Sequence, residues 1–387
     1  LSRHPLFQIM LVVQNNSAAR LHLPGLEAEL LGAAVDSVKF DLTIAATEQP
    51  ATGALRFTVD YAADLFEQST VLDLTHRLIR LLDRATAAPE TPMSRLDVLT
   101  GAERRTLLEQ WSGAPARHPA DRPVHRLVEE QAQARPDATA LVFGEQRVAY
   151  AELEERANRL GHHLAEAGLG RGDVVGVYLE RGIDLVVAVL AVLKAGGAYT
   201  MLDPEFPAER IASVLGHTGA RLLITRDGLS GRLPGVAEVV LDRDAEAIAA
   251  RPAHGPDPVA GPDDAACVMF TSGSTGRPKG VVSPHRAIVG TLLGQDFAEF
   301  GPGHVWLQCA PVSWDAFALE LFGPLLSGGT CVLQPGQRPE PAVIAALVRE
   351  HAVTTMHVSA SLLNFLLDEY PAAFTGLRQV MTGGEAA

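Results

Sequence analysis

The segment best suited to chemistry is a run of glycine and hydroxyl residues that follows an apolar stretch at Cys267–Phe270. Its glycines let the backbone approach a ligand closely and let several N–H groups turn toward one point. Its hydroxyls and one lysine add donors for phosphate oxygens. The residues that predict this polyphosphate-binding loop are Thr271, Ser272, Gly273, Ser274, Thr275, Gly276 and Lys279.

The spacing of this loop differs from that of the P-loop NTPases. Their loop is Gly-x-x-x-x-Gly-Lys-Ser/Thr and opens a helix. Here Pro278 stands between Gly276 and Lys279, and Gly280–Val282 predicts a strand. On composition alone, a flexible serine/glycine hairpin stays open as the alternative.

The elements that must position the loop alternate between helix and strand from Pro123 to Ala387. Apolar periodicity predicts helices over 150–167, 184–195, 316–326, 341–351 and 359–367. It predicts strands over 174–179, 221–225, 238–241, 267–270, 305–308, 330–333, 354–357 and 379–382. Such alternation is typical of an α/β fold with mainly parallel sheets, where ligands bind at the carboxyl ends of the strands.

The beginning of the chain has a different pattern. Strands are predicted over 7–13, 38–44 and 54–61, followed by a helix that Ser69 caps. A short helix over 103–110 and a stretch rich in proline, glycine and alanine then indicate a linker. The predicted organisation is therefore one partial domain over 1–95, a linker over 96–122 and a second domain over 123–387.

Composition excludes several classes of function. The formal net charge of −14 argues against a general nucleic-acid or anionic-membrane surface, since such surfaces need a basic field. No apolar run is long enough to span a bilayer, and the N-terminus does not have the pattern of a signal peptide. The three cysteines have neither metal-ligand nor disulfide spacing. These features predict a cytoplasmic protein with reduced thiols and no protein-held metal.

The loop at 270–280 resembles the phosphate-binding signature of the adenylate-forming superfamily, which includes acyl-CoA synthetases, luciferases and the adenylation domains of nonribosomal peptide synthetases. This resemblance implies that the loop holds the β- and γ-phosphates of ATP, with Mg²⁺, while a carboxylate attacks the α-phosphorus. The products would be an acyl-AMP and pyrophosphate.

Further segments are similar to core motifs of peptide-synthetase adenylation domains, in the correct order. They are 148–153, with Ala149 where Thr or Ser is usual, 193–199 with 202–211, 313–322, with Trp314 where Phe is usual, and 382–386. The last resembles the loop that packs on adenine, which adds Gly384, Glu385 and Ala386 to the expected nucleotide-binding residues. The implied fold is the large N-terminal subdomain of an adenylate-forming enzyme, incomplete at its C-terminal side.

The first region resembles the end of a condensation domain, through 2–8, 40–43 and 61–66. The implied fold is part of a chloramphenicol-acetyltransferase-like lobe, with the upstream condensation half as a partner. The family's His-His-x-x-x-Asp-Gly motif is absent, and His162-His163 lies in a predicted helix of the adenylation region. No catalytic residue is assigned, because the expected catalytic lysine and condensation histidine lie outside the chain.

Asp315 indicates the class of substrate. A carboxylate at a strand-to-helix junction is costly to bury unless it is paired, and the α-ammonium group of an amino acid is a suitable partner. In peptide synthetases an aspartate at the matching position has this role, although a helix N-cap is the alternative. By the same resemblance, the side-chain pocket includes Ala316, Leu319, His357, Met381 and Gly383.

The resulting hypothesis is an ATP-dependent ligase that converts an α-amino acid to aminoacyl-AMP for transfer to the phosphopantetheine thiol of a separate carrier domain. The chain alone is expected to be inactive or weakly active. Two alternatives stay open: an acyl- or aryl-CoA ligase, and a non-catalytic interdomain platform.

Overall fold

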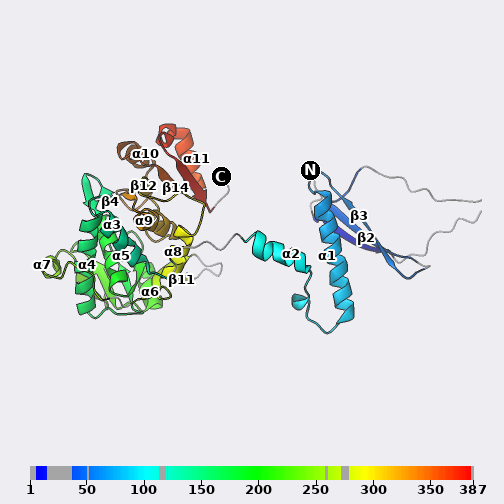
Figure 1. Cartoon of the computed structure of the whole chain (residues 1–387), viewed down its shortest axis with the longest axis horizontal. Coiled ribbons are helices and arrows are strands. Elements are labelled where there is room, and N and C mark those ends of the chain that lie inside the picture. Colours follow the sequence, from blue (N-terminus) through cyan, green and yellow to red (C-terminus); the bar gives the residue numbers. More distant parts are fainter. Residues whose placement is uncertain are drawn as a thin grey trace, which may run out of the picture. The chain divides into compact units, whose positions relative to one another are not determined.

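The computed structural model describes residues 6–14, 37–49, 52–112, 119, 121–257, 260–271 and 279–384. The chain divides into two compact units, Leu1–Pro115 and Ala116–Ala387 (Figure 1). The division falls inside the segment 96–122 that the sequence assigns to the linker.

The first unit contains a three-stranded sheet. Strand β1 (Ile9–Gln14) pairs in parallel with β2 (Leu42–Glu48), which pairs antiparallel with β3 (Leu55–Tyr61). The predicted start of β2 at residue 38 is wrong. The paired strand begins at Leu42, which lies opposite Tyr61, the last residue of β3.

Helix α1 (Gln68–Ala87) follows the sheet. The predicted cap at Ser69 is wrong, because Glu67 occupies the N-cap position and Ser69 lies within the helix. Within α1, Val71 is the one buried residue, whereas Leu72, Leu74 and Leu82 are exposed. In the described part of the chain, most of the apolar side chains of this helix are therefore not fully covered by another element.

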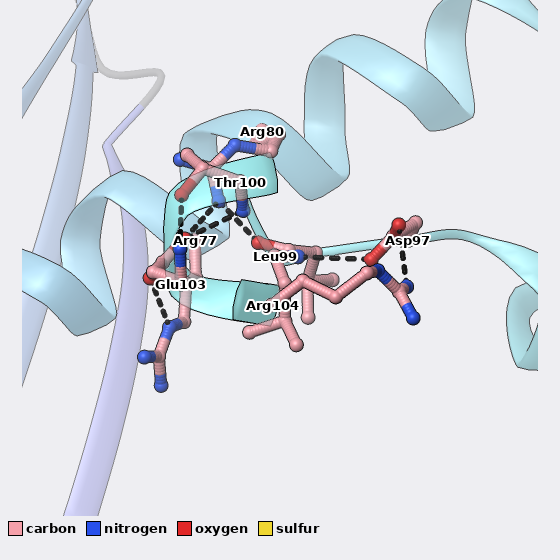
Figure 2. A network of polar contacts seen from close by, with 8 residues as sticks. Arg77, Arg80, Asp97, Leu99, Thr100, Glu103 and Arg104 are labelled. Atoms are coloured by element: carbon pink, nitrogen blue, oxygen red, sulfur yellow. Dashed lines mark hydrogen bonds and ion pairs between the residues drawn. The ribbon is translucent and has the colours of Figure 1, made fainter. Parts of the chain in front are cut away.

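A polar network ties α1 to the next helix, α2 (Gly101–Arg105) (Figure 2). Thr100 Oγ1 accepts a hydrogen bond from the Glu103 N–H at 3.1 Å, and Glu103 Oε2 accepts one from the Thr100 N–H at 2.6 Å. This reciprocal capping box starts the helix, earlier than the predicted residue 103. Glu103 also pairs with Arg77 and Arg80 of α1, at 3.0 and 3.2 Å. Beyond α2 the chain continues as a π-helical turn, η2 (Thr106–Gln110).

The Glu103 network predicts a pH dependence of the first unit. Hydrogen bonds from Thr100, together with Arg77, lower the pKa of Glu103 from its ordinary 4.5 to about 2. Its stabilisation is therefore complete above about pH 4.5 and is lost as the pH falls toward 2. We expect Glu103→Gln to lower the urea midpoint of the first unit at pH 7 and to flatten its change between pH 5 and 2. Glu90→Gln, at an exposed position of the same unit, is the control; equal pH profiles for the two variants would contradict the prediction.

The second unit contains two six-stranded sheets. The first has the order β11 (Lys279–Pro284), β10 (Ala265–Thr271), β7 (Ala198–Met201), β6 (Val174–Val177), β8 (Leu222–Thr225) and β9 (Ala237–Val240). The second has the order β15 (Gln379–Gly383), β14 (Thr355–Ser359), β12 (Val305–Gln308), β13 (Thr330–Leu333), β4 (Thr139–Phe143) and β5 (Gln146–Ala149). Pairing is parallel except between β10 and β11 and between β4 and β5, so the predicted α/β fold is confirmed.

Helices accompany both sheets (Figure 1). They are α3 (Val124–Ala134), α4 (Tyr150–Glu166), α5 (Ile183–Lys194), α6 (Ala208–Thr218), α7 (Ala245–Ala249), α8 (His285–Leu293), α9 (Asp315–Ser327), α10 (Pro341–Glu350) and α11 (Ala360–Glu369). Short 3₁₀ turns occur at η1 (Met93–Arg95), in the first unit, and at η3 (Pro371–Phe374).

The main core lies around α5, which is apolar on all sides from Leu185 to Leu193. A helix of this kind must be covered all round, and α4, β6 and β7 pack against it. Lys194 ends α5 with its side chain only 2% exposed, and its Nζ lies 2.5 Å from Glu154 Oε1 of α4. This ion pair crosses the α4–α5 contact inside the core.

Removing one partner of this pair leaves the other charge uncompensated. We expect Lys194→Met to lower the unfolding free energy of the second unit by about 3 kcal/mol, the usual cost of breaking a buried pair. The double variant Lys194→Met/Glu154→Gln should recover part of that loss, since it leaves no unpaired charge. Urea denaturation of the unchanged chain, Lys194→Met and the double variant measures both effects; a double variant at least as unstable as Lys194→Met would contradict the prediction.

Candidate functional site

The second unit contains a cavity of about 1150 Å³ at the carboxyl ends of β12, β14 and β15. The cavity walls come from α8, the loop between β12 and α9, the first turns of α9 and α11, and the end of β15. Its lining is mainly apolar. This is the edge of the sheet at which the sequence places a ligand.

Asp315 lies on the wall of this cavity. It is the first residue of α9 and is exposed, with its Oδ1 accepting a hydrogen bond from the Ala316 N–H at 2.9 Å. The alternative assignment of Asp315 as the N-cap is wrong, because Trp314 occupies that position and its side chain makes no capping bond. A carboxylate at this place, open to the cavity, can pair with a cationic group of a ligand.

His357 lies on β14 and lines the same cavity, with its side chain 23% exposed. Its Nδ1 is 3.6 Å from Oε1 of Glu320, a residue of α9 that is completely buried. The other carboxylate oxygen, Oε2, accepts three hydrogen bonds, from the N–H groups of Cys309 and Ala310 at 2.9 Å and from Gln308 Nε2 at 3.1 Å. Glu320 therefore joins the cavity wall after β12 to the histidine on β14.

Arg181 holds the same loop from its carbonyl side. This arginine follows β6, is 4% exposed and donates to the carbonyl oxygens of Cys309 at 3.2 Å, Ala310 at 2.9 Å, Gln334 at 3.3 Å and Gln337 at 3.0 Å. Burial lowers the pKa of Arg181. The backbone of Cys309 and Ala310 thus lies between a buried carboxylate, bound through its N–H groups, and a buried guanidinium, bound through its carbonyl oxygens.

The balance of charge around Arg181 involves two carboxylates. Glu320 and Asp203 both raise the pKa of Arg181 and so oppose the effect of its burial. For the acid Asp203, burial acts in the other direction and raises the pKa. Its side chain accepts a hydrogen bond from the Glu205 N–H at 2.9 Å. The positive charge of Arg181 is therefore balanced by two carboxylates, and it in turn compensates their negative charge.

Sequence reasoning did not single out Glu320 or Arg181 as site residues. Glu320 is a charged residue in the otherwise apolar stretch Phe317–Leu326, and that contrast was the available signal. Arg181 has no comparable signal, because its partners lie 128 to 156 residues away along the chain.

The described residues of the expected phosphate loop lie at its two ends. Thr271 ends β10, Lys279 begins β11, both are exposed, and the two residues are cross-strand partners. A lysine side chain therefore stands opposite a hydroxyl where the loop begins and ends. The remaining expected residues, Ser272, Gly273, Ser274, Thr275 and Gly276, lie outside the described part of the chain.

The other expected ligand residues are divided between the cavity and its surroundings. Ala316, Leu319 and Gly383 line the cavity with Gly384, whose φ of +87° favours glycine. Met381 is half-buried on β15 in register with His357 but is not among the lining residues. Glu385 and Ala386 lie outside the described residues.

Metal ligands and membrane-spanning helices were also sought in the described residues. That part of the chain holds no group of three or more His, Cys, Asp or Glu residues placed to bind a metal ion. Nor does any helix there have the length and apolarity that crossing a membrane requires.

Comparison with known proteins identifies the class to which this site belongs. Residues 128–387 match the family described as AMP-binding enzyme, and the chain belongs to that family. Residues 1–108 match the family described as Condensation domain. These two matches, with relatives and solved structures that are nonribosomal peptide synthetases, confirm the family that the sequence predicts.

Curated relatives match along nearly the whole chain. The chain is 35% identical over 405 residues to the dimodular nonribosomal peptide synthase of Bacillus subtilis, covering 99% of the chain and 17% of that relative. It is 40% identical over 398 residues to phosphinothricin tripeptide synthetase PhsC of Streptomyces viridochromogenes, covering 100% of the chain and 36% of that relative. The chain thus spans well under half of the length of either relative.

Solved structures match with high similarity of fold. The nonribosomal peptide synthetase FmoA3 in its α-methyl-L-serine-AMP bound form matches with a TM-score of 0.76 and 29% identity, over 92% of this chain and 40% of that chain. The N-terminal subdomain of Klebsiella oxytoca NpsA, in complex with 3-hydroxybenzoyl-AMSN, matches with a TM-score of 0.62 and 28% identity, over 68% of this chain and 67% of that chain.

Proposed function

We propose that residues 123–387 bind ATP and an α-amino acid and take part in forming an aminoacyl-AMP. The observation that carries this proposal is the cavity that brings the Asp315 carboxylate together with the glycine pair Gly383 and Gly384. Asp315 would pair with the α-ammonium group, and the glycines would allow the adenosine part to lie close to the backbone.

In the proposed reaction a carboxylate oxygen of the amino acid attacks the α-phosphorus of ATP. The bond from that phosphorus to the bridging oxygen breaks, and pyrophosphate leaves with the bond's electron pair. Thr271, Lys279 and the segment between them would hold the departing phosphates, whose negative charge a lysine and hydroxyl groups suit. Mg²⁺ would enter with the nucleotide and neutralise part of its charge.

The surrounding organisation is proposed on the same basis. Residues 1–95 would belong to the condensation domain and contact its upstream half, and residues 96–122 would link the two domains. The aminoacyl group would pass to the phosphopantetheine thiol of a carrier domain, in the cytoplasm, where ATP is supplied. Glu385 and Ala386 would join the adenine-binding residues, and Met381 would support the pocket beside His357, its partner on the neighbouring strand.

A second function is favoured by one specific observation. NpsA, whose N-terminal subdomain resembles the second unit, has been solved with 3-hydroxybenzoyl and anthranilyl analogues, so an aryl acid is an alternative substrate. An aryl acid without an amino group leaves Asp315 without a partner, which favours the amino acid.

Binding of non-hydrolysable acyl-adenylate analogues to the 387-residue chain tests both functions by calorimetry. The amino-acid function predicts that one or a few aminoacyl analogues bind and that fatty-acyl and benzoyl analogues do not. Binding of benzoyl analogues alone would establish the second function. A folded chain that binds none of them would overturn both.

A further inference from the structure

The cavity lining includes several hydroxyl side chains, such as Ser359 and Ser361, and two basic side chains, His357 and Arg338, any of which can recognise the polar end of a substrate side chain. Arg338 also lines it, but its side chain is 83% exposed and pairs with Glu205 at 2.8 Å. His357 is only 23% exposed and belongs to the strand that forms the wall. The substrate side chain, buried in the cavity, is therefore expected to meet the imidazole of His357.

Glu320 determines which nitrogen of the His357 imidazole carries the proton. Its Oε2 already accepts three hydrogen bonds, whereas its Oε1 has no hydrogen-bond partner among the described residues and lies 3.6 Å from His357 Nδ1. A buried carboxylate oxygen needs a donor nearby, so Nδ1 is the nitrogen that carries the proton. In the neutral imidazole, Nε2 is then an acceptor.

The lining of the cavity is mainly apolar, and this makes an unpaired Nε2 costly. Ile288, Leu292, Leu319 and Leu362 line the cavity with His357, and their side chains offer no hydrogen bond. A substrate that fills the cavity without a donor would leave Nε2 buried and unpaired. A site built around such a polar group rejects ligands that cannot pair with it.

We propose that Glu320 is a positioning residue that holds His357 with Nε2 as an acceptor, and that the substrate is an α-amino acid whose side chain ends in an O–H or N–H donor. This inference rests on the proposed amino-acid function and adds the class of the side chain. His357 would touch the substrate, and Glu320 would act through His357.

The experiment measures the binding of matched pairs of aminoacyl-adenylate analogues to the 387-residue chain. The members of each pair differ in one donor group: tyrosyl and phenylalanyl, threonyl and valyl, tryptophanyl and its benzothienyl counterpart, ornithyl and norvalyl. We expect the donor member of at least one pair to bind about tenfold more tightly, or more. His357→Leu should reduce that ratio to near one.

Glu320→Gln gives a readout that a merely structural role would not change. Three donors surround the position of Oε2, so the amide oxygen must take that place and the amide nitrogen must face His357. The amide then donates to Nδ1, which moves the imidazole proton to Nε2. Side chains that can only donate should lose their advantage, whereas hydroxyl side chains should keep it because they also accept.

Arg232→Gln is the control variant. Arg232 is exposed in the loop between β8 and β9, so its replacement should leave every ratio unchanged. Aminoacyl analogues that bind without any preference within the pairs would overturn this inference and leave the proposed function standing. An unchanged preference in His357→Leu, or a donor-only preference that survives in Glu320→Gln, would also overturn it. If a folded chain binds no aminoacyl analogue, the proposed function fails and this inference fails with it.

Discussion

Replacement of Asp315 by asparagine is expected to weaken the binding of aminoacyl-adenylate analogues by about 30-fold or more. A charge pair that a bound ligand shields from water is worth about 2 kcal/mol or more when one partner is removed. Asparagine keeps a side-chain oxygen that can accept the hydrogen bond from the Ala316 N–H, so the start of α9 should be unaffected. The loss would then report the missing charge.

The measurement that isolates this charge compares each aminoacyl analogue with its counterpart that lacks the α-amino group. In the unchanged chain the amino form should bind more tightly, and in Asp315→Asn the two forms should bind nearly alike. Because Asp315 is exposed, the thermal midpoint of the second unit should stay within a few degrees of its original value. An amino preference that survives the substitution would assign the α-ammonium group to another partner.

Replacement of Arg181 by leucine has the largest expected effect on stability. It removes the donor of four buried carbonyl oxygens and leaves Glu320 and Asp203 without their nearby cation. We expect the unfolding free energy of the second unit to fall by about 3–5 kcal/mol. Arg181→Lys should recover only part of it, since an ammonium group lacks the planar fork that reaches several acceptors at once.

Urea denaturation of the second unit measures this loss. The matched control is Arg243→Leu, because Arg243 pairs with Asp227 at 2.6 Å on the surface and both side chains are more than half exposed. That change should cost less than about 1 kcal/mol. Equal losses for the two variants would show that Arg181 does not hold the cavity wall.

Much of the fold was predictable because each local pattern agrees with the final structure. Short apolar runs bounded by turn residues predicted β10, β12 and β13 close to their observed bounds, since buried strands in such sheets have nearly continuous apolar sequence. The bounds at β2 and α1 were less accurate. Pairing with β3 decides where β2 begins, and such pairing is not local information.

The candidate site was predictable only in part, for a related physical reason. Asp315 opens the helix that follows β12, and His357 lies on β14, so both fall toward the carboxyl ends of strands, where an α/β fold places ligands. The groups that hold them in place act through backbone atoms of distant segments. Arg181 bonds to the carbonyl oxygen of Ala310, 129 residues away, and the type of residue at position 310 has no influence on that contact.

The second sheet has a consequence for how the chain reaches its native state. The hairpin of β4 and β5 is synthesised well before its neighbour β13, and Thr330 Oγ1 donates to Thr139 O across 191 residues. The other six-stranded sheet, from β6 to β11, lies wholly between residues 139 and 330. Closing so long a loop is slow compared with local pairing. During synthesis on a ribosome, the sheet that contains β6 to β11 can therefore form while β4 is still unpaired on the side that β13 later occupies.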